Sequence, residues 1–208
     1  MRQKSKENKK TRKQGVLTQD VAAIQKVLGG DVRAYAALVN KYQSMVFVLV
    51  RGVCRSAEDA QEVTQDVFLK VYQQLHTYKG NASFRTWLYR IAYNTAISSI
   101  RKTQSLERRS EAYAQDVLHT TDRAEEETDD PRVAQQDKLR SLLETLPPQD
   151  RMLIELYYYK ELKMDDVATI CGLTQSNAKV RIFRIRQKLQ EAMTAKEAVT
   201  AEEDITAT

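Results

Sequence analysis

The sequence predicts an all-α protein in which a flexible linker joins two small helical domains. Its 208 residues include six glycines and three prolines, so few positions break a helix. Apolar residues recur at spacings of three and four, as on one face of a helix, and few stretches alternate as strands do. This periodicity fades over residues 104–135 and then resumes, which places one domain on either side.

The first domain is expected to cover residues 18–103, and its first long helix follows a glycine pair. Asp31 comes directly after Gly29 and Gly30 and is the expected N-cap of that helix. The apolar face of the helix consists of Val32, Tyr35, Val39, Tyr42, Val46, Leu49 and Val53. This spacing favours a helix over a strand for the whole segment.

Two further helices are predicted in this domain, with a loop between them. Ser56 is the expected N-cap of the second helix. The buried stripe of the second helix consists of Ala60, Val63, Val67, Val71 and Leu75. The loop covers residues 77–82, which include Gly80, and Ser83 is expected to cap a third helix that ends near Lys102.

From Val67 to Leu106 the sequence contains no acidic side chain but almost half of the aromatic residues of the chain. These aromatic residues are Phe68, Tyr72, Tyr78, Phe84, Trp87, Tyr89 and Tyr93. Some of the rings are expected to lie in the core. A helix face exposed to water usually carries both signs of charge, however, so the missing acids favour a partner. Cations follow phosphates and rings stack on bases, which indicates nucleic acid with exposed bases.

The segments outside the two domains are rich in charge and poor in apolar residues. Six acidic residues and one arginine lie between Asp122 and Asp130, which indicates a flexible acidic linker over residues 104–135. Residues 1–17 form a basic tail, and residues 194–208 form a small and polar one. Both tails are expected to be disordered.

The second domain, residues 136–193, contains the pattern of a helix-turn-helix motif at residues 164–181. Gly172 permits the tight turn between two short helices, and Thr174 or Ser176 can cap the second of them. The residues expected to bury the inner face of the first short helix are Val167, Ala168 and Cys171.

The second helix of the motif has an apolar inner side and a basic outer side. Its inward positions are Ala178, Ile182, Ile185 and Leu189. Between Thr174 and Gln190 there are five basic residues and no acid. A recognition helix in a major groove needs this pattern, because its front touches base edges while its cations meet phosphates. It is expected to be the last of three short helices over residues 149–192.

The composition excludes several classes of protein. A formal net charge of +5 and an isoelectric point of about 9.1 favour a polyanionic partner. Two cysteines without a CxxC spacing cannot form a zinc site, and no nucleophile–base spacing accompanies the two histidines. We therefore predict no catalytic residue, no metal and no cofactor. The longest apolar run, Met45–Val50, is too short to cross a membrane, and the N-terminus is no secretory signal, so a soluble cytoplasmic protein is expected.

Several segments, taken in their order along the chain, resemble one known family. The most specific is Phe-Arg-Thr-Trp-Leu-Tyr-Arg-Ile-Ala at residues 84–92. The others are residues 59–72, residues 146–151 and the helix-turn-helix with residues 180–186. With these segments the chain resembles the extracytoplasmic-function (ECF) group of bacterial sigma factors, in the sigma-70 family. The resemblance covers residues 18–103 and 136–193.

The resemblance implies a protein without enzymatic activity that directs RNA polymerase to promoters, as in a stress response. Such a protein would bind the core polymerase at its β′ clamp helices and β flap, recognise the −10 and −35 elements and melt the promoter. The helix at residues 58–72 would meet the clamp helices. Its implied contact residues are Asp59, Glu62, Gln65, Asp66 and Phe68. An anti-sigma factor that wraps both domains is the implied regulator.

The resemblance also assigns DNA contacts to both domains. The loop at residues 77–82 and the helix after it would hold the −10 element as single-stranded non-template DNA, with one base taken out of the stack. The residues implied there are Tyr78, Asn81, Phe84, Arg85, Trp87, Arg90, Asn94 and Arg101. Those implied at the −35 element are Ser176, Asn177, Lys179, Val180, Arg181, Phe183, Arg184 and Arg186.

Two other classes stay open on the sequence alone. A helix-turn-helix regulator that does not replace the specificity subunit of polymerase explains the second domain, but not the acid-free aromatic stretch of the first. It predicts tight binding to duplex DNA without polymerase. An enzyme acting on single-stranded DNA is the other class, and the few histidines argue against it.

Overall fold

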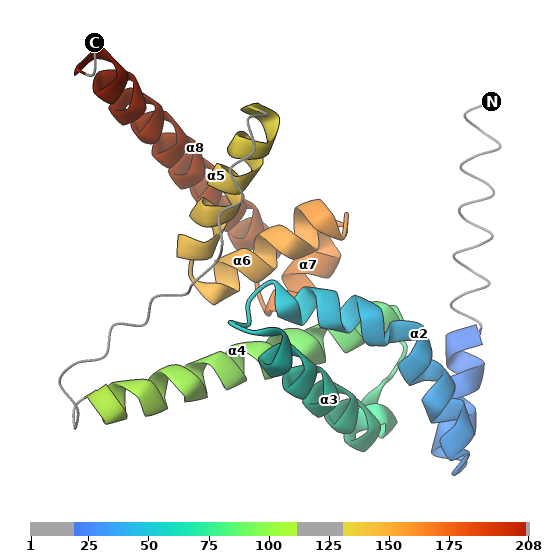
Figure 1. Ribbon diagram of the computed structural model, residues 1–208. Helices are drawn as coiled ribbons and strands as arrows, with labels where there is room; N and C mark the ends of the chain where they lie inside the picture. Colours follow the sequence, from blue (N-terminus) through green and yellow to red (C-terminus); the bar gives the residue numbers. More distant parts are fainter. Residues whose placement is uncertain (1–18, 112–130, 207–208) are drawn as a thin grey trace, which may run out of the picture. The chain divides into compact units, whose positions relative to one another are not determined.

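The computed structural model describes residues 19–111 and 131–206, and these residues form helices joined by turns and short loops (Figure 1). The all-α prediction is confirmed. The helices are one at residues 19–28, α2 (Val32–Arg51), α3 (Ala57–Gln74), the 3₁₀ turn η1 (Leu75–Thr77), α4 (Phe84–Glu111), α5 (Pro131–Thr145), α6 (Pro148–Ile154), the π-helical turn η2 (Glu155–Tyr159), α7 (Met164–Cys171) and α8 (Gln175–Thr206). They fall into two units: of the described residues, 19–99 and 169–172 form the first unit, and 100–111, 131–168 and 173–206 form the second.

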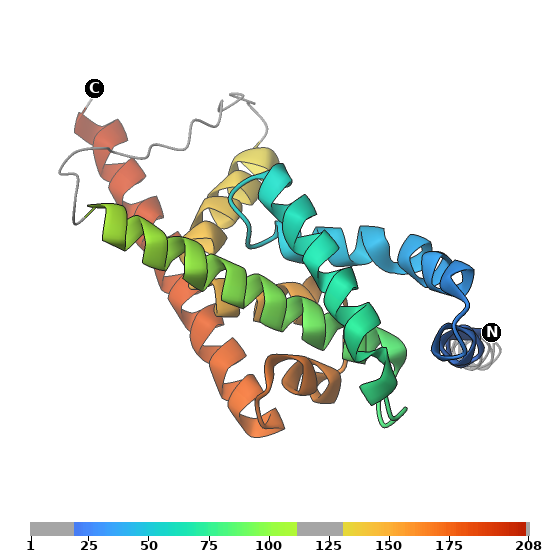
Figure 2. The same cartoon turned by 90° about the horizontal axis from the view of Figure 1, so that it is seen from below.

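The core of the first unit lies where α2, α3 and the beginning of α4 meet (Figure 2). The stripe predicted for α3, from Ala60 to Leu75, is buried at every position. The face predicted for α2 is buried from Tyr42 onward, but Val32, at the start of the helix, is exposed. The largest fully buried side chain in the described residues is Tyr89 of α4.

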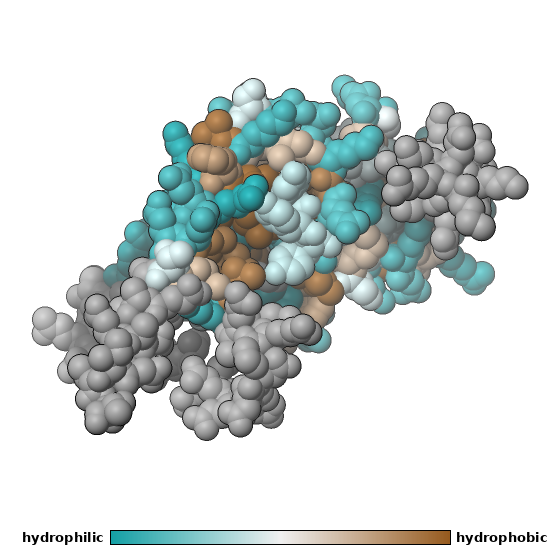
Figure 3. Space-filling model, turned by 90° about the horizontal axis from the view of Figure 1, so that it is seen from above, coloured by the Kyte–Doolittle hydropathy of each residue, from teal (hydrophilic) through white to brown (hydrophobic). Residues whose placement is uncertain are grey.

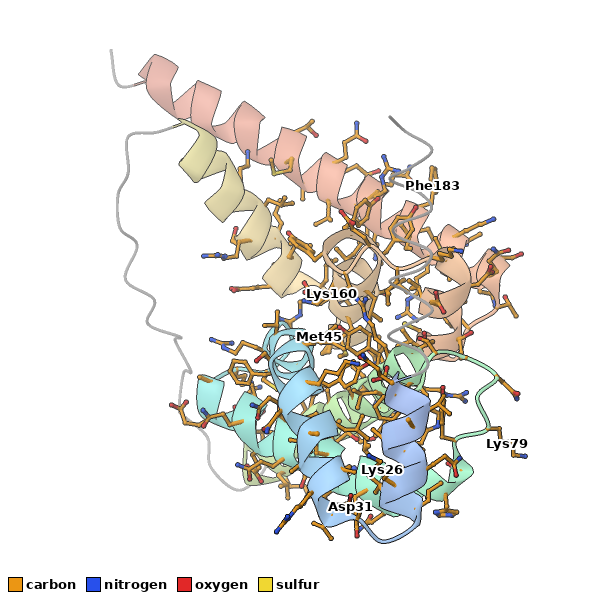
Figure 4. All side chains as sticks on the ribbon, turned by 90° about the vertical axis from the view of Figure 1, so that its right-hand side faces the viewer. Lys26, Asp31, Met45, Lys79, Lys160 and Phe183 are labelled. Atoms are coloured by element: carbon orange, nitrogen blue, oxygen red, sulfur yellow. The ribbon has the colours of Figure 1, made fainter. Side chains whose placement is uncertain are left out.

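Each long helix of the first unit begins at the residue that the sequence predicts. The carboxylate of Asp31 accepts hydrogen bonds from two backbone amides of α2 and lies at the turn before it (Figure 4). Ser56 and Asp59 form a reciprocal capping box at the start of α3. The Ser83 Oγ accepts a hydrogen bond from the Thr86 amide at 3.1 Å, at the start of α4. The three predicted N-caps are therefore confirmed.

A buried carboxylate joins the helix at residues 19–28 to α2. Asp20 is 3 % exposed, and its two oxygens accept hydrogen bonds from Lys41 Nζ at 2.5 Å and Tyr42 Oη at 2.6 Å. Ile24 and Val27 of the same helix are also buried. A buried charge requires such partners, because leaving it without them would cost several kcal/mol. The contact fixes where this helix lies on α2.

The core of the second unit is built around α6, α7 and the first half of α8. Its buried side chains include Met152, Leu153, Leu156, Val167, Ala178, Ile182 and Ile185. The turn of the helix-turn-helix agrees with the prediction: Gly172 has φ +67°, and Thr174 Oγ1 accepts a hydrogen bond from the Asn177 amide at 3.2 Å. Cys171, predicted to be buried, is half-buried, because Ile170 takes the inner position instead.

Three predicted helix ends are wrong. α4, expected to stop near Lys102, continues to Glu111, and α5 begins at Pro131, inside the predicted linker. α8, expected to be short, continues to Thr206 through the predicted tail. These extensions contain good helix formers and no internal glycine or proline, which favours a helix at these positions. The predictions for residues 1–17 and for the centre of the linker lie outside the described residues.

The described side chains visible in Figure 3 are mostly hydrophilic, with smaller hydrophobic areas between them. Within residues 19–111 and 131–206, no helix combines the length and apolar character needed to cross a membrane.

Tyr35 ties α2 to α3 through a hydroxyl that is shielded from water. Its hydroxyl donates a hydrogen bond to the Phe68 carbonyl oxygen, and its ring meets the edge of the Tyr72 ring at 4.9 Å between centroids. Burial, aided by the neighbouring Tyr72, raises the pKa of Tyr35 from 10.0 to about 12. The folded chain therefore holds this proton more tightly than the unfolded chain does.

We expect this difference to make the first domain lose stability at alkaline pH. Below pH 10 both states keep the proton, whereas between pH 10 and about 12 the unfolded chain loses it first and unfolding becomes easier. Tyr35→Phe should lower the free energy of unfolding by about 1 kcal/mol at pH 8, because one hydrogen bond is lost. It should also make the alkaline decline shallower. Urea unfolding followed by Trp87 fluorescence at pH 8 and pH 11 measures both effects, and parallel declines would contradict the assignment.

The segment between η2 and α7 contains a residue in a backbone conformation that favours glycine. Glu161 has φ 48°, and the preceding Lys160 amide closes the π-helical turn on the Glu155 carbonyl oxygen at 2.9 Å. The side chains of Lys160 and Glu155 also form an ion pair at 3.1 Å. A left-handed conformation costs an L-residue roughly 1–2 kcal/mol, because its Cβ crowds the following carbonyl.

Replacement of Glu161 by glycine should therefore stabilise the second domain. The strain relieved exceeds the backbone entropy that glycine adds to the unfolded chain, so the expected gain is about 0.5–1 kcal/mol. Glu161→Ala is the matched control, since it removes the exposed carboxylate but keeps the Cβ, and it should give no such gain. Thermal unfolding followed by circular dichroism compares the two variants. An equal response in both would show that the backbone conformation is not the cause.

Candidate nucleic-acid interface

Three aromatic rings form a cluster where the loop at residues 78–83 meets α4. The Tyr78 ring packs edge-on against Phe84 at 5.7 Å and lies tilted against Trp87 at 5.5 Å, and Phe84 stacks on Trp87 at 5.7 Å between centroids. Tyr78 and Trp87 are half-buried, whereas Phe84 is 1 % exposed. Phe84 therefore forms the floor of the cluster, and the other two rings present part of their surface to solvent.

The hydroxyl of Tyr78 closes the loop on itself. It donates a hydrogen bond to the Ala82 carbonyl oxygen at 2.8 Å. Burial, and then the nearby charge of Asp20, raises the pKa of Tyr78 above its ordinary value of 10.0. Asn81 and Lys79 of the same loop are exposed, and Lys79 points away from the helices (Figure 4).

One face of α4 continues from this cluster. Trp87, Arg90, Asn94 and Arg101 follow one another at spacings of three, four and seven, which places them on the same side of the helix. Arg90, Asn94 and Arg101 are exposed. The sequence over this face contains no acid, so its cations are available to a polyanion.

The structure places two of the predicted residues differently. Phe84 is buried, so its ring does not belong to the exposed surface, and it packs against Tyr78 and Trp87. The guanidinium of Arg85 lies over the Tyr89 ring at 5.3 Å and its Nε is buried, so Arg85 is half-buried and not part of the exposed face. Hydrophobic periodicity could have shown this, since Arg85 lies next to the buried stripe of α4.

An acidic surface occupies the outer side of α3. Asp59, Glu62, Gln65 and Asp66 are all exposed, and their contact with a protein partner stays a prediction. Asp59 also caps the start of α3, because its carboxylate accepts a hydrogen bond from the Ser56 amide at 3.3 Å. The negative charges in this first turn also suit the positive end of the helix dipole.

Phe68 does not belong to that surface, which corrects the prediction. Its side chain is 8 % exposed and its carbonyl oxygen accepts the hydrogen bond from Tyr35, so it is a core residue. Sequence reasoning missed Leu69 and Tyr72, which are large, exposed and on the same side as Glu62 and Gln65. The available signal was that both positions fall outside the buried stripe of α3.

The outer face of α8 is the second candidate surface. Ser176, Asn177, Lys179, Val180, Phe183, Arg184 and Arg186 are all exposed there. Val180 and Phe183 are 47 % and 65 % exposed, and Phe183 is labelled on the outer side of the helix in Figure 4. The opposite side of the helix is buried in the domain. An apolar centre with cationic edges fits the shape and charge of a major groove.

Arg181 differs from the other residues predicted on α8. Its Nε donates a hydrogen bond to Asp150 Oδ1 of α6 at 2.5 Å, and the two side chains form an ion pair. Arg181 is half-buried and links α8 to α6, and its contact with a phosphate stays a prediction.

These two surfaces define a class of protein before any comparison is made. One presents a helix-turn-helix with a basic, apolar-centred recognition helix, and the other presents half-exposed rings next to a basic face. Among the described residues, no group of His, Cys, Asp and Glu side chains could hold a metal ion. The arrangement defines a DNA-binding protein with one site suited to duplex and another suited to unpaired bases.

Comparison with known families identifies the class more closely. Residues 38–106 match the model of sigma-70 region 2, and residues 136–189 match that of sigma-70 region 4. The chain is 31 % identical to the RNA polymerase sigma-H factor of Pseudomonas aeruginosa over 181 residues, which cover 84 % of this chain and 94 % of that protein. It is 30 % identical to the ECF RNA polymerase sigma-E factor of Escherichia coli strain K12 over 82 % of this chain and 92 % of the relative. The chain belongs to the sigma-70 family, as a sigma factor of the ECF group.

Solved structures show the same fold. CnrH, in complex with the cytosolic domain of CnrY, matches with a TM-score of 0.59 at 22 % identity, over 85 % of this chain and 98 % of CnrH. The sigma factor RpoE of Bartonella quintana, in complex with the anti-sigma factor NepR, matches with a TM-score of 0.58 at 19 % identity, over 77 % of this chain and 96 % of RpoE.

The family assignment decides between the functions that the sequence leaves open. The protein binds core RNA polymerase and promoter DNA, and it directs promoter recognition and the initiation of transcription. It is not an enzyme, because the polymerase forms the bonds. Its relatives include ECF factors of the sigma-E type.

Proposed function

We propose that the loop at residues 78–83 and the outer face of α4 hold the −10 element as unpaired non-template DNA. The observation that carries this proposal is the arrangement of three rings, in which Tyr78 and Trp87 are half-exposed and Phe84 supports them from the core. Rings that are already held in place can stack on a base without losing much side-chain freedom.

The energies of base capture are consistent with this arrangement. Taking one base out of the duplex costs a few kcal/mol, and stacking on an aromatic ring returns about 1–3 kcal/mol. Asn81 is exposed on the same loop and offers both a donor and an acceptor to a base edge. Arg90 and Arg101, on the outer face of α4, supply charge to the phosphates.

The outer face of α8 is proposed to read the −35 element in duplex DNA. Lys179 and Arg184 can donate hydrogen bonds to guanine or to phosphate oxygens. Val180 lies between them on the exposed surface and suits the methyl group of a thymine. Ser176 and Asn177, in the first turn, bring short polar side chains to the same groove.

The acidic surface of α3 is proposed to meet the β′ clamp helices of the core polymerase. Its polar residues Asp59, Glu62, Gln65 and Asp66 are exposed, and Leu69 and Tyr72 add apolar area beside them. A polar rim with an apolar centre is typical of protein interfaces. The second domain would meet the β flap, so that polymerase spans the two promoter elements.

An anti-sigma factor is the proposed regulator, and the cytoplasm the proposed place of action. The support for the regulator is that the solved relative RpoE of Bartonella quintana is in complex with the anti-sigma factor NepR. A partner that covers the acidic surface of α3 or the outer face of α8 would block initiation without altering the fold.

The double variant Lys179→Ala with Arg184→Ala should abolish initiation that depends on the −35 element. Both cations lie on the exposed face of α8, and each specific contact to a base contributes about 1–3 kcal/mol of discrimination. Binding of the core polymerase should be unchanged, because neither side chain belongs to the buried core. Run-off transcription and a pull-down of core polymerase measure the two properties.

The matched control is Arg140→Ala with Lys163→Ala, which removes the same charge from exposed positions of the second domain outside α8. It should leave transcription close to that of the unchanged protein. If the α8 variant loses both transcription and polymerase binding, the assignment of this helix to DNA is wrong.

Tyr78→Ala and Asn81→Ala should each impair promoter opening more than binding to closed duplex. Loss of the Tyr78 ring removes about 1–3 kcal/mol of stacking, which corresponds to a decrease of about fivefold or more in the open complex. Permanganate footprinting of unpaired thymines measures the opening, and a filter-binding assay measures engagement of the duplex.

Tyr158→Ala is the matched control for the loss of a tyrosine, since this ring is exposed in the second domain. Asn40→Ala, at an exposed position of α2, serves the same purpose for the amide. Neither control should alter the footprint. Unchanged melting in the Tyr78 and Asn81 variants would refute base capture by this loop.

A further inference from the structure

A continuous line of contacts leads from the buried carboxylate of Asp20 to the rings at the surface. Asp20 accepts the hydrogen bond of Tyr42 Oη at 2.6 Å. The Tyr42 ring packs edge-on against Phe84 at 5.5 Å, and Phe84 contacts both Tyr78 and Trp87 at 5.7 Å between centroids. The inner members of this line are buried and the outer two are half-exposed.

The position of Phe84 depends on the ring of Tyr42. A buried interior is close-packed, so a ring that turns must displace the rings it touches. The hydrogen bond to a carboxylate is stronger than one between neutral groups and fixes the Tyr42 ring in one orientation. Because Phe84 is 1 % exposed, it has no free space to move into if Tyr42 changes its position.

Asp20 is held from a second side as well, which makes it a fixed point for the cluster. Its other oxygen pairs with Lys41 Nζ at 2.5 Å. Lys41 also lies over the Tyr42 ring at 5.2 Å, and its side chain is 37 % exposed, so it shields the carboxylate from the outside. The match to sigma-70 region 2 begins at residue 38, so Asp20 and its helix lie outside the segment that the family model covers.

We propose that Asp20 and Tyr42 are positioning residues for recognition of the −10 element. They hold Phe84, and through it Tyr78 and Trp87, in the arrangement that accepts an unpaired base. The helix at residues 19–28 is then part of the apparatus that opens the promoter, although neither Asp20 nor Tyr42 touches DNA. This inference rests on the proposed base capture by the loop at residues 78–83.

The test uses the complete chain bound to core polymerase. The probe is a fluorescein-labelled single-stranded oligonucleotide that carries the non-template −10 sequence recovered by run-off transcription of a randomised promoter pool. Tyr42→Phe keeps the ring and removes the hydroxyl, and Asp20→Asn removes the charge. Each should weaken binding by about fivefold, the effect of one buried hydrogen bond on an equilibrium. The double variant should bind no more weakly than either single variant, because both act through one contact.

Tyr35→Phe is the matched control. It also removes one tyrosine hydroxyl and one hydrogen bond from the first domain, but at the Phe68 carbonyl, away from the ring cluster. It should lower stability and leave oligonucleotide binding unchanged. A second readout is acrylamide quenching of Trp87, the only tryptophan of the chain, in the absence of polymerase and DNA. Tyr42→Phe should change this quenching, and Tyr35→Phe should not.

The outcomes separate the two proposals. If Tyr78→Ala weakens oligonucleotide binding but Tyr42→Phe and Asp20→Asn do not, base capture stands and the positioning role is refuted. Equal losses in Tyr42→Phe and Tyr35→Phe would also refute it, since they would show a general effect of stability. If Tyr78→Ala itself binds the oligonucleotide normally, base capture fails, and the positioning role fails with it.

Discussion

Phe84 stands at the first turn of α4, and three rings from two other segments and from its own helix surround it. Tyr42 contacts it from α2, and Tyr78 contacts it from the loop at residues 78–83. Trp87 lies one turn further along α4. In the proposed contact with DNA, the first domain presents two half-exposed rings that pack against this one buried ring. The buried and the exposed rings therefore act together, because Tyr78 and Trp87 are held in place by their contacts with Phe84.

The first domain carries its acidic and its basic side chains on different surfaces. In the first domain the acids are concentrated on the outer side of α3, while the exposed face of α4 has arginines and no acid. In the proposed complex, polymerase and DNA therefore approach the same small domain without competing for one surface. The protein makes no bond itself, so its contribution is the free energy of these contacts, which offsets the cost of opening the duplex.

The sequence predicts well what depends on neighbours along the chain. The N-caps Asp31, Ser56 and Ser83, the buried stripe of α3 and the exposed face of α8 all follow from spacing and side-chain chemistry. The sequence predicts poorly the contacts between residues that lie far apart along the chain. Nothing near Arg181 in the sequence shows that Asp150 will pair with it. The helix ends at Glu111 and Thr206 depend on helix propensity, which cannot be recognised from a periodic pattern of apolar residues.

The pairing of Arg181 with Asp150 has a consequence for how α8 responds to ions. Binding to DNA gains free energy when cations of the protein displace counterions that were condensed on the phosphates. An arginine that a carboxylate has already neutralised displaces few of them. The proposed attraction of α8 to DNA would therefore depend less on ionic strength than its number of basic residues suggests. A larger share of it would come from the fit of Val180 and Phe183 in the groove.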